Sequence, residues 1–287
     1  MTLNRSIINI LNKVLGLVNL KLDSLTAQHK DNLRLTKIEE AGFLNEPVFP
    51  LPDSFDENVY QNILDYLPDF QKRFDSFRDA DSNDVGFAYG NNYFEACDAE
   101  VLYTLMRTKK PSRITEIGCG NSTRVIRQAL LDGDWTCQHL AIDPCPRVDI
   151  AKLADEIRDD FIEFINPEEI ATSLQSGDFL FIDTTHEVRP GNDVAFIFGQ
   201  LLPRLKPGVI VHIHDIFLPY DYPPEFVYNE GAKWGEQYIV QAMIANNPSW
   251  RIVWPGYFMQ KNTPNFAKYF PRAGKALAQS FWIEKLT

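Results

Sequence analysis

Two apolar segments of the chain end in side chains that can transfer a proton or bind a cation. FLFIDTTH, residues 179–186, is apolar for four residues and then carries Asp183 and, three positions later, His186. VIVHIHD, residues 209–215, is a second apolar run and ends in His214 and Asp215. An imidazole with a pKa of about 6.5 suits a general base near neutral pH, and carboxylate oxygens are ligands for hard cations. Both segment ends are therefore candidates for catalysis.

The spacing in HIHD also invites a zinc-hydrolase interpretation, which fits poorly. The aspartate is adjacent to His214, and no second histidine follows it, so the HxHxDH pattern of those enzymes is not matched. His212 lies inside the apolar run, where a hydrogen-bonded core histidine is the expected role.

A third segment, EIGCGNSTRVI, has the pattern of a cofactor-binding loop, because it follows a predicted strand and opens a predicted helix. Gly118 and Gly120 allow a tight turn and a close approach to a ligand, while Asn121, Ser122 and Thr123 can cap the helix. A dinucleotide site favours a third small residue where Thr123 stands, so the pattern favours another nucleotide-like cofactor over NAD.

Two acidic residues at strand ends extend this predicted cofactor site. Asp143 ends the next strand, where a carboxylate accepts hydrogen bonds from ribose hydroxyls; its alternative role is to start a helix before Pro144. Glu116, at the end of the first strand, can attract the cationic end of a cofactor, or it can pair with Arg113 or Arg124.

The elements that must position these residues alternate along the chain. The hydrophobic pattern predicts helices at 95–108, 122–132, 149–159, 167–175 and 192–205 and strands at 113–118, 139–143, near 161–165, 178–183 and 208–215. Nearly continuous apolar strands between helices indicate a parallel sheet covered on both faces. In such a doubly wound α/β fold, ligands bind beyond the carboxyl ends of the strands, where all the candidate segments lie.

Five segments, in this order, resemble the class I S-adenosylmethionine (SAM) dependent methyltransferases, especially the metal-dependent branch that methylates sugars and other small molecules. They are ITEIGCGNST, AIDPCPR, GDFLFIDTTH, LPRLKPGVIVHIHDIFLPYDYP and SFWIEK. The resemblance covers roughly residues 85–287. It implies a Rossmann-like sheet of about seven strands, with SFWIEK as a last, antiparallel strand. Residues 1–84 would then form an N-terminal helical extension and a linker.

The resemblance also implies a set of cofactor-binding residues. Those expected around the methionine part of SAM and at the start of the following helix are Glu116, Gly118, Cys119, Gly120, Asn121 and Ser122. Asp143 would hold the ribose, and Glu163 and Phe164 would lie near the adenine. Tyr93 or Phe94, upstream of these segments, is expected to close the pocket over SAM.

The same resemblance places a divalent metal between the ends of the fourth and fifth strands. Asp183 and Asp215 are the expected ligands for Mg²⁺ or Mn²⁺. His214 departs from the family pattern, so it either shifts the preference toward Mn²⁺, Fe²⁺ or Zn²⁺ or lies outside the first ring of ligands. His186 stands where sugar-modifying relatives carry a histidine, and we expect it to be the general base. The alternatives are loop hydrogen bonds for Asp215, a contact with the cofactor loop for Asp183, and a surface position for His186.

Composition narrows the range of partners and compartments. Lys and Arg total 28 against 39 Asp and Glu, a formal charge of -11, so we expect no nucleic-acid partner. The four cysteines form no CxxC pair, and no signal peptide is evident, which favours the cytoplasm. Residues 2–22 show helical amphipathic spacing, which predicts packing on the domain or on a second subunit of a homo-oligomer, or contact with a membrane surface.

The sequence thus predicts a SAM-dependent O-methyltransferase acting on a hydroxyl of a sugar, glycan or natural product, assisted by a divalent metal and a histidine base. One alternative is an NAD-dependent oxidoreductase on the same fold. Another is a non-catalytic, methyltransferase-like assembly subunit, although the intact cofactor loop and IDTTH segment favour an enzyme.

Overall fold

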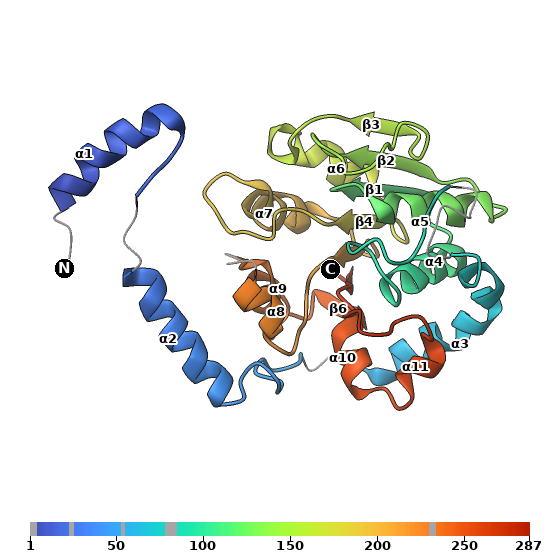
Figure 1. Cartoon of the computed structure of the whole chain (residues 1–287). Coiled ribbons are helices and arrows are strands. Elements are labelled where there is room, and N and C mark those ends of the chain that lie inside the picture. The colour runs from blue at the N-terminus through green and yellow to red at the C-terminus, as the bar shows by residue number, and fades with distance from the viewer. Residues whose placement is uncertain (1–4, 23–25, 53–54, 78–84, 230–233) are drawn as a thin grey trace. The chain divides into compact units, whose positions relative to one another are not determined.

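The computed structural model describes residues 5–22, 26–52, 55–77, 85–229 and 234–287 (Figure 1). The chain divides into two compact units, Met1–Glu46 and Pro47–Thr287. In the first unit lie α1 (Arg5–Leu15), the short helix η1 (Gly16–Val18) and α2 (Thr26–Glu40). The N-terminal helix predicted from the amphipathic spacing is therefore present.

The apolar side chains of α1 are exposed: Ile10 is 65% and Val14 62% accessible. No helix among the described residues is both long and apolar enough to cross a membrane. What covers this face, the domain itself, a second subunit or a membrane surface, stays a prediction.

The second unit is built on a seven-stranded sheet with the order β3-β2-β1-β4-β5-β7-β6. The strands are β1 (Arg113–Ile117), β2 (Gln138–Ile142), β3 (Glu156–Arg158), β4 (Phe179–Ile182), β5 (Ile210–Ile213), β6 (Trp250–Pro255) and β7 (Phe281–Lys285). Strands β1 to β5 pair in parallel, and β7 runs antiparallel to both β5 and β6. The predicted Rossmann-like fold and the antiparallel SFWIEK strand are confirmed.

Longer and shorter helices surround this sheet. The longer ones are α3 (Glu57–Phe74), α4 (Asp98–Lys109), α5 (Asn121–Leu131) and α9 (Glu236–Ile244). The shorter ones are η2 (Ile162–Phe164), α6 (Pro167–Ser173), α7 (Asp193–Phe196), η3 (Ile197–Leu201), η4 (Leu202–Arg204), α8 (Pro224–Asn229), α10 (Gly256–Asn262) and α11 (Phe266–Tyr269). Helix α4 packs against α3 and α5, while α6 packs against η3 and η4.

The sequence prediction was wrong between β2 and α6. The expected helix 149–159 is a turn followed by β3, and the expected strand near 161–165 is the helical turn η2. The Asp149 side chain accepts a hydrogen bond from the Ala151 amide, and Asp155 pairs with His139 through both its amide and its carboxylate. Pairing with the edge of β2 thus outweighs the local helical spacing, which is a weak signal in a short segment.

Helix α3 lies within residues 1–84, which we expected to form an N-terminal helical extension and linker, but it belongs to the second unit. Its residues Tyr60, Leu64, Leu67 and Phe74 are buried in the main core. The first compact unit consequently ends at Glu46, before the expected boundary at residues 84 and 85.

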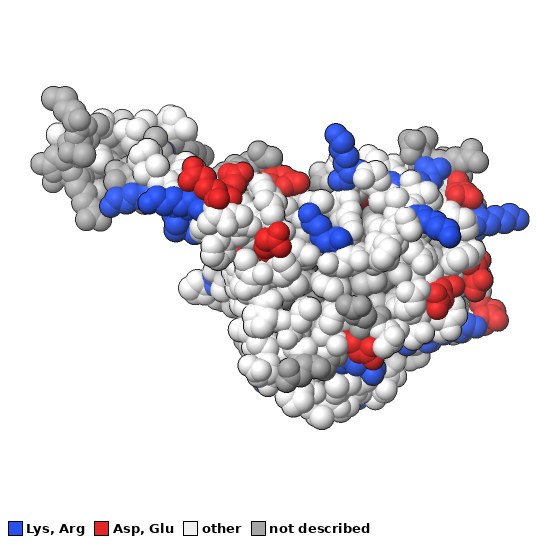
Figure 2. Space-filling model, turned by 90° about the horizontal axis from the view of Figure 1, so that it is seen from below, with Lys and Arg blue, Asp and Glu red and all other residues white. Residues whose placement is uncertain are grey.

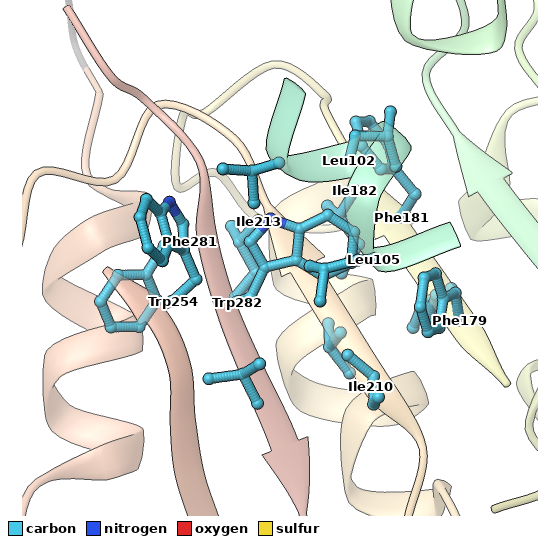
Figure 3. Close-up of a cluster of buried hydrophobic side chains, with 14 of the residues drawn as sticks. Leu102, Leu105, Phe179, Phe181, Ile182, Ile210, Ile213, Trp254, Phe281 and Trp282 are labelled. Carbon is cyan, nitrogen blue, oxygen red and sulfur yellow. The ribbon is translucent and has the colours of Figure 1, made fainter. Parts of the chain in front are cut away.

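The core on β4, β5 and β7 is rich in aromatic side chains (Figure 3). The Trp282 ring of β7 lies 5.5 Å from that of Phe179 on β4, and Figure 3 shows both among Ile210, Ile213 and other apolar side chains. His212 stacks on Phe181 at 3.8 Å and reaches Ser280 Oγ at 3.0 Å, so its interpretation as a core histidine is confirmed.

The molecular face in Figure 2 carries basic side chains interspersed with acidic ones. Among the residues described on this face, Lys and Arg do not gather into one continuous patch of the kind that follows a nucleic-acid backbone. This distribution agrees with the overall acidic charge.

A buried carboxyl at the start of α4 is expected to make stability depend on pH. Burial raises the pKa of Glu100 to about 7, although Tyr89 and the Cys97 amide donate hydrogen bonds to it. Between its ordinary pKa and about 7, the folded protein holds a proton that the unfolded chain has lost. The free energy of unfolding therefore falls as pH rises through this window, by about 3 kcal/mol.

Urea unfolding at pH 5 and pH 8 measures this dependence. Glu100→Gln is expected to make the decrease smaller, whereas Glu168→Gln, at an exposed position, is expected to keep it. Equal decreases in the two variants would show that Glu100 is not the responsible group.

Candidate functional site

The strand register brings four candidate segments to one edge of the sheet. Ile117 of β1 is paired with Ile142 of β2 and with Ile182 of β4, which in turn is paired with Ile213 of β5. The residues that follow these four are Gly118, Asp143, Asp183 and His214. Parallel pairing therefore brings them together at the carboxyl ends of the strands, as predicted for a doubly wound sheet.

A cavity of about 430 Å³ opens at this edge. The expected site residues that line it are Tyr93, Phe94, Gly118, Cys119, Gly120, Asn121, Ser122, Asp143, Glu163 and Asp183. Pockets of a few hundred cubic ångströms are typical of small-molecule and cofactor sites. The cavity is therefore the candidate cofactor site.

Gly118 is required by the backbone geometry of the cofactor loop. Its φ is +82°, and a Cβ built at this position would lie 1.7 Å from the backbone oxygen of Asp183. The amide of Gly118 donates to Ile142 O, and that of Asp183 donates to Ile117 O. The loop after β1 thus lies directly against the end of β4, which only a residue without a side chain allows.

Asp143 organises the loop as well as lining the cavity. One of its carboxylate oxygens accepts from the Cys119 amide, and the other accepts from the Cys145 amide, each at 2.7 Å. Each carboxylate oxygen has a further lone pair, so these bonds leave acceptor capacity for a ligand hydroxyl.

Glu116 does not line the cavity, although we expected it to surround the cofactor. It is fully buried, accepts a hydrogen bond from Ser122 Oγ at 2.7 Å and lies 3.0 Å from His139 Nε2. The partners of Glu116 in these two contacts are Ser122 and His139, not the predicted Arg113 or Arg124. Its carboxylate therefore holds the start of α5 against the sheet.

Phe164 also departs from expectation, because it is 82% exposed and does not line the cavity. In the helical turn η2, Phe161, Ile162 and Glu163 line the cavity instead. The cause is the change from the predicted strand to a helical turn, which alters the direction of each side chain.

Tyr93 and Phe94 contribute to the cavity from the chain segment before α4. Asn91 Oδ1 accepts from the amides of both residues, at 3.0 and 2.8 Å, and so fixes this turn. The guanidinium of Arg147 lies 4.7 Å from the Tyr93 ring centre. Since Arg147 also lines the cavity, this cation–π pair joins two of its walls.

The segment after β4 is held by the start of α7. Asp193 accepts hydrogen bonds from the Thr185 amide at 2.9 Å and from its hydroxyl at 2.8 Å. Asn192 Nδ2 donates to the carbonyl of Glu187 at 2.8 Å. These bonds fix the backbone on both sides of His186.

Asp183, His186 and Asp215 meet beside the cavity. His186 Nε2 lies 3.4 Å from Asp183 Oδ1 and 3.1 Å from Asp215 Oδ2. One nitrogen or oxygen of each residue lies within 4.8 Å of the others, a spacing that suits binding to a single metal ion. Because Asp183 also lines the cavity, the cluster adjoins the candidate cofactor site.

Glu236, at the first position of α9, completes the surroundings of His186. Its Oε2 lies 2.9 Å from His186 Nδ1, and its side chain is fully buried. Sequence reasoning did not place Glu236 in this cluster, because nothing in the sequence connects it with a histidine 50 positions earlier. The sole local signal was an acid directly after glycine in a segment rich in aromatic residues.

The backbone is strained at two members of the cluster. His186 has φ +58° and Asp215 has φ +57°, in the left-handed region that residues other than glycine rarely adopt. Gln279 donates a side-chain hydrogen bond to Asp215 Oδ1, which leaves Oδ2 facing His186. Such strain persists where surrounding contacts determine the conformation, and it is frequent at functional sites.

His214 does not join the cluster, contrary to its predicted role as a metal ligand. It is buried at the end of β5, with its ring centre 5.3 Å from that of Phe94. Neither ring nitrogen has a hydrogen-bond partner among the described residues. His214 and Asp215 follow β5, which ends at Ile213, and the left-handed backbone at Asp215 (φ +57°) changes the direction of the chain between these two side chains.

The carboxylates around the cluster control its proton affinity. Burial lowers the pKa of His186, but Asp215, Asp183 and Glu236 outweigh burial and hold this pKa well above its ordinary range. The pKa of Asp183 lies below its ordinary value. Burial raises this pKa, but the nearby His214 and His186 lower it by more. The carboxylates around His186 therefore favour a positive charge at this position.

The aromatic segment after β5 packs mostly on itself. Phe217, Tyr220, Tyr222 and Tyr257 form a separate buried cluster. Trp234 packs against this cluster and also reaches His186, because the centres of the two rings lie 4.8 Å apart. Core packing therefore accounts for most of these side chains.

Comparisons with known proteins found one family-model match and several similar solved structures. Residues 115–216, less than half of the chain, match a family model described as a methyltransferase domain. Among solved structures, the chain is similar to the SAH-bound methyltransferase PaMTH1 of Podospora anserina, with 14% identity and a TM-score of 0.44 over 93% of this chain and 100% of that one. It is also similar to the plantazolicin methyltransferase BamL in complex with SAH and a triazolic desmethylPZN analog. That match has 14% identity and a TM-score of 0.40 over 80% of this chain and 100% of that one. No curated protein matches the chain.

The matched segment runs from β1 through β5 and includes the cofactor loop, Asp143 and the cluster residues Asp183, His186 and Asp215. Together with the seven-stranded topology, this match supports a SAM-dependent methyltransferase.

Proposed function

We propose that this chain is a SAM-dependent O-methyltransferase that acts on a hydroxyl of a sugar, glycan or natural product with the help of a divalent metal. The observation that carries the proposal is that Asp183 belongs both to the lining of the cavity and to the cluster with His186 and Asp215. Its side chain lines the cavity next to the glycine loop, and its carboxylate lies 3.4 Å from His186 in the cluster with Asp215. A methyl donor in the cavity and an acceptor at the cluster would therefore be neighbours.

The donor end of the site suits SAM. The cavity is lined by Gly118, Gly120 and Asn121 at the start of α5 and by Asp143, whose carboxylate has remaining acceptor capacity. The absence of a third small residue at Thr123 favours SAM over a dinucleotide. The walls formed by Tyr93 and Phe94 suit the flat adenine or the sulfonium of SAM.

The acceptor end has the donor atoms of a metal site. Two carboxylates and an imidazole face one another, a set that suits Mn²⁺, Fe²⁺ or Zn²⁺ and, through its oxygens, Mg²⁺. A bound divalent ion would act as a Lewis acid that lowers the pKa of an acceptor hydroxyl. Asp183 and Asp215 would hold the ion, and His186 would bind a metal or act as a base in its neutral form.

Isothermal titration calorimetry with SAM, SAH and NAD tests the cofactor. We expect SAM and SAH to bind with similar affinity and NAD to give no heat of binding. Binding of NAD without SAM or SAH would contradict the proposal and favour the oxidoreductase alternative. Tight SAM binding without methyl transfer to any of a panel of sugars, polyols and catechols would favour the assembly subunit.

A further inference from the structure

We propose that His186 is itself a ligand of the divalent cation, through Nε2, and that Glu236 is the positioning residue that presents this nitrogen to Asp183 and Asp215. The inference rests on the proposed function, because the cation site belongs to it. It changes two sequence expectations: His186 takes the place of His214 among the ligands, and it coordinates the cation rather than accepting the acceptor's proton.

The distances around His186 Nε2 support coordination. This nitrogen lies 3.1 Å from Asp215 Oδ2 and 3.4 Å from Asp183 Oδ1. Adjacent ligands of an octahedral ion with bonds of about 2.1 Å lie roughly 3 Å apart, so a single ion fits between the three atoms. A base, by contrast, must face an acceptor hydroxyl, and here both neighbours of Nε2 are carboxylates.

Glu236 determines which ring nitrogen is available. Its Oε2 lies 2.9 Å from Nδ1. In the neutral tautomer that carries its hydrogen on Nδ1, Glu236 accepts this hydrogen, and the Nε2 lone pair can bind a cation between the aspartates. Histidines that bind metals commonly donate their other N–H to a carboxylate, which fixes the tautomer and the ring orientation. The Glu236 side chain is fully buried, so this orientation does not compete with solvent.

Neighbouring side chains hold the three proposed ligands through contacts that do not use the atoms facing the cation site. Gln279 binds the outer oxygen of Asp215, and Asp193 fixes Thr185 beside His186. Trp234 covers one side of the imidazole. His214, with two unpartnered ring nitrogens among the described residues, lies outside this arrangement and is not needed for it.

The test uses the full chain with Mn²⁺ as the probe and calorimetry as the measurement. We expect wild type to bind one Mn²⁺ and His186→Ala to bind it at least tenfold more weakly. Glu236→Ala is expected to weaken Mn²⁺ binding about ten- to a hundredfold. Glu236→Gln is expected to fall between, because its amide oxygen can still accept from Nδ1. Among the variants that keep His186, only the Glu236 variants should alter its Nδ1 signal in ¹⁵N-histidine spectra of the metal-free protein.

Glu225→Ala is the matched control, since Glu225 is an exposed acid on the neighbouring helix α8. It should bind Mn²⁺ as wild type does, and SAH binding by every variant reports correct folding. Wild-type Mn²⁺ affinity in a folded His186→Ala variant would overturn the assignment of His186 as a ligand. Wild-type protein that binds SAH but no Mn²⁺ would remove the cation site and leave the SAM proposal intact. Absence of SAH binding would instead contradict the proposed function.

Discussion

Gly118→Ala is expected to destabilise the protein by about 2–4 kcal/mol and to lower SAH affinity at least tenfold. The left-handed φ of +82° costs a residue with a Cβ about 1–2 kcal/mol, and the new Cβ would meet the Asp183 carbonyl oxygen at 1.7 Å. The loop can relieve this contact only by moving away from β4, which alters the cavity wall. Urea unfolding and SAH calorimetry measure the two effects.

Gly177→Ala separates the two causes of this loss. Gly177 also has a positive φ, +88°, but nothing lies within 4 Å of a Cβ built there, and it does not line the cavity. We expect this variant to lose only about 1 kcal/mol and to bind SAH as wild type does. Similar losses for the two variants would mean that the contact with Asp183 is unimportant.

His186→Ala is expected to reduce methyl transfer at least about a hundredfold while leaving SAH affinity unchanged. Removal of a group that acts on the acceptor proton, directly or through a bound cation, typically costs a factor of this size or more. SAH binding is expected to survive because His186 does not line the cavity. The measurement is transfer of labelled methyl from SAM to the first acceptor that wild type methylates in a panel of sugars, polyols and catechols.

His29→Ala and His186→Asn complete this experiment. His29 is an exposed histidine on α2, and its variant is expected to keep full activity. Because His186→Ala leaves three carboxylates facing one another, the smaller polar change to Asn guards against a loss caused by unfolding alone. Normal turnover by a folded His186 variant would show that the cluster does not take part in the reaction.

The cofactor half of the site follows largely from the sequence. The pattern of apolar strand, glycine turn and helix is local, so EIGCGNST could be assigned to a loop and placed at the edge of a parallel sheet before any coordinates were known. The register then aligned Gly118, Asp143 and Asp183, as a doubly wound sheet requires. The same local reasoning was wrong at Phe164, because pairing of Asp155 with β2 replaced the expected helix and strand.

The catalytic half depended on contacts that no local pattern specifies. The sequence named Asp183, His186 and Asp215, but it grouped the aspartates with His214, because residues adjacent in sequence were assumed to be adjacent in space. Among the described residues, His214 is not part of the group formed by Asp183, His186 and Asp215, and the backbone at His186 and Asp215 is left-handed where these two side chains meet. Glu236 reaches the cluster from another helix.

The sequence by itself therefore determined the fold class, the cofactor loop and the residue types at the strand ends, since each of these depends on short-range spacing. Only the tertiary structure decided which side chains share a site and which proton each one holds. Those properties depend on burial and on charges supplied by distant segments, as the three carboxylates around His186 show.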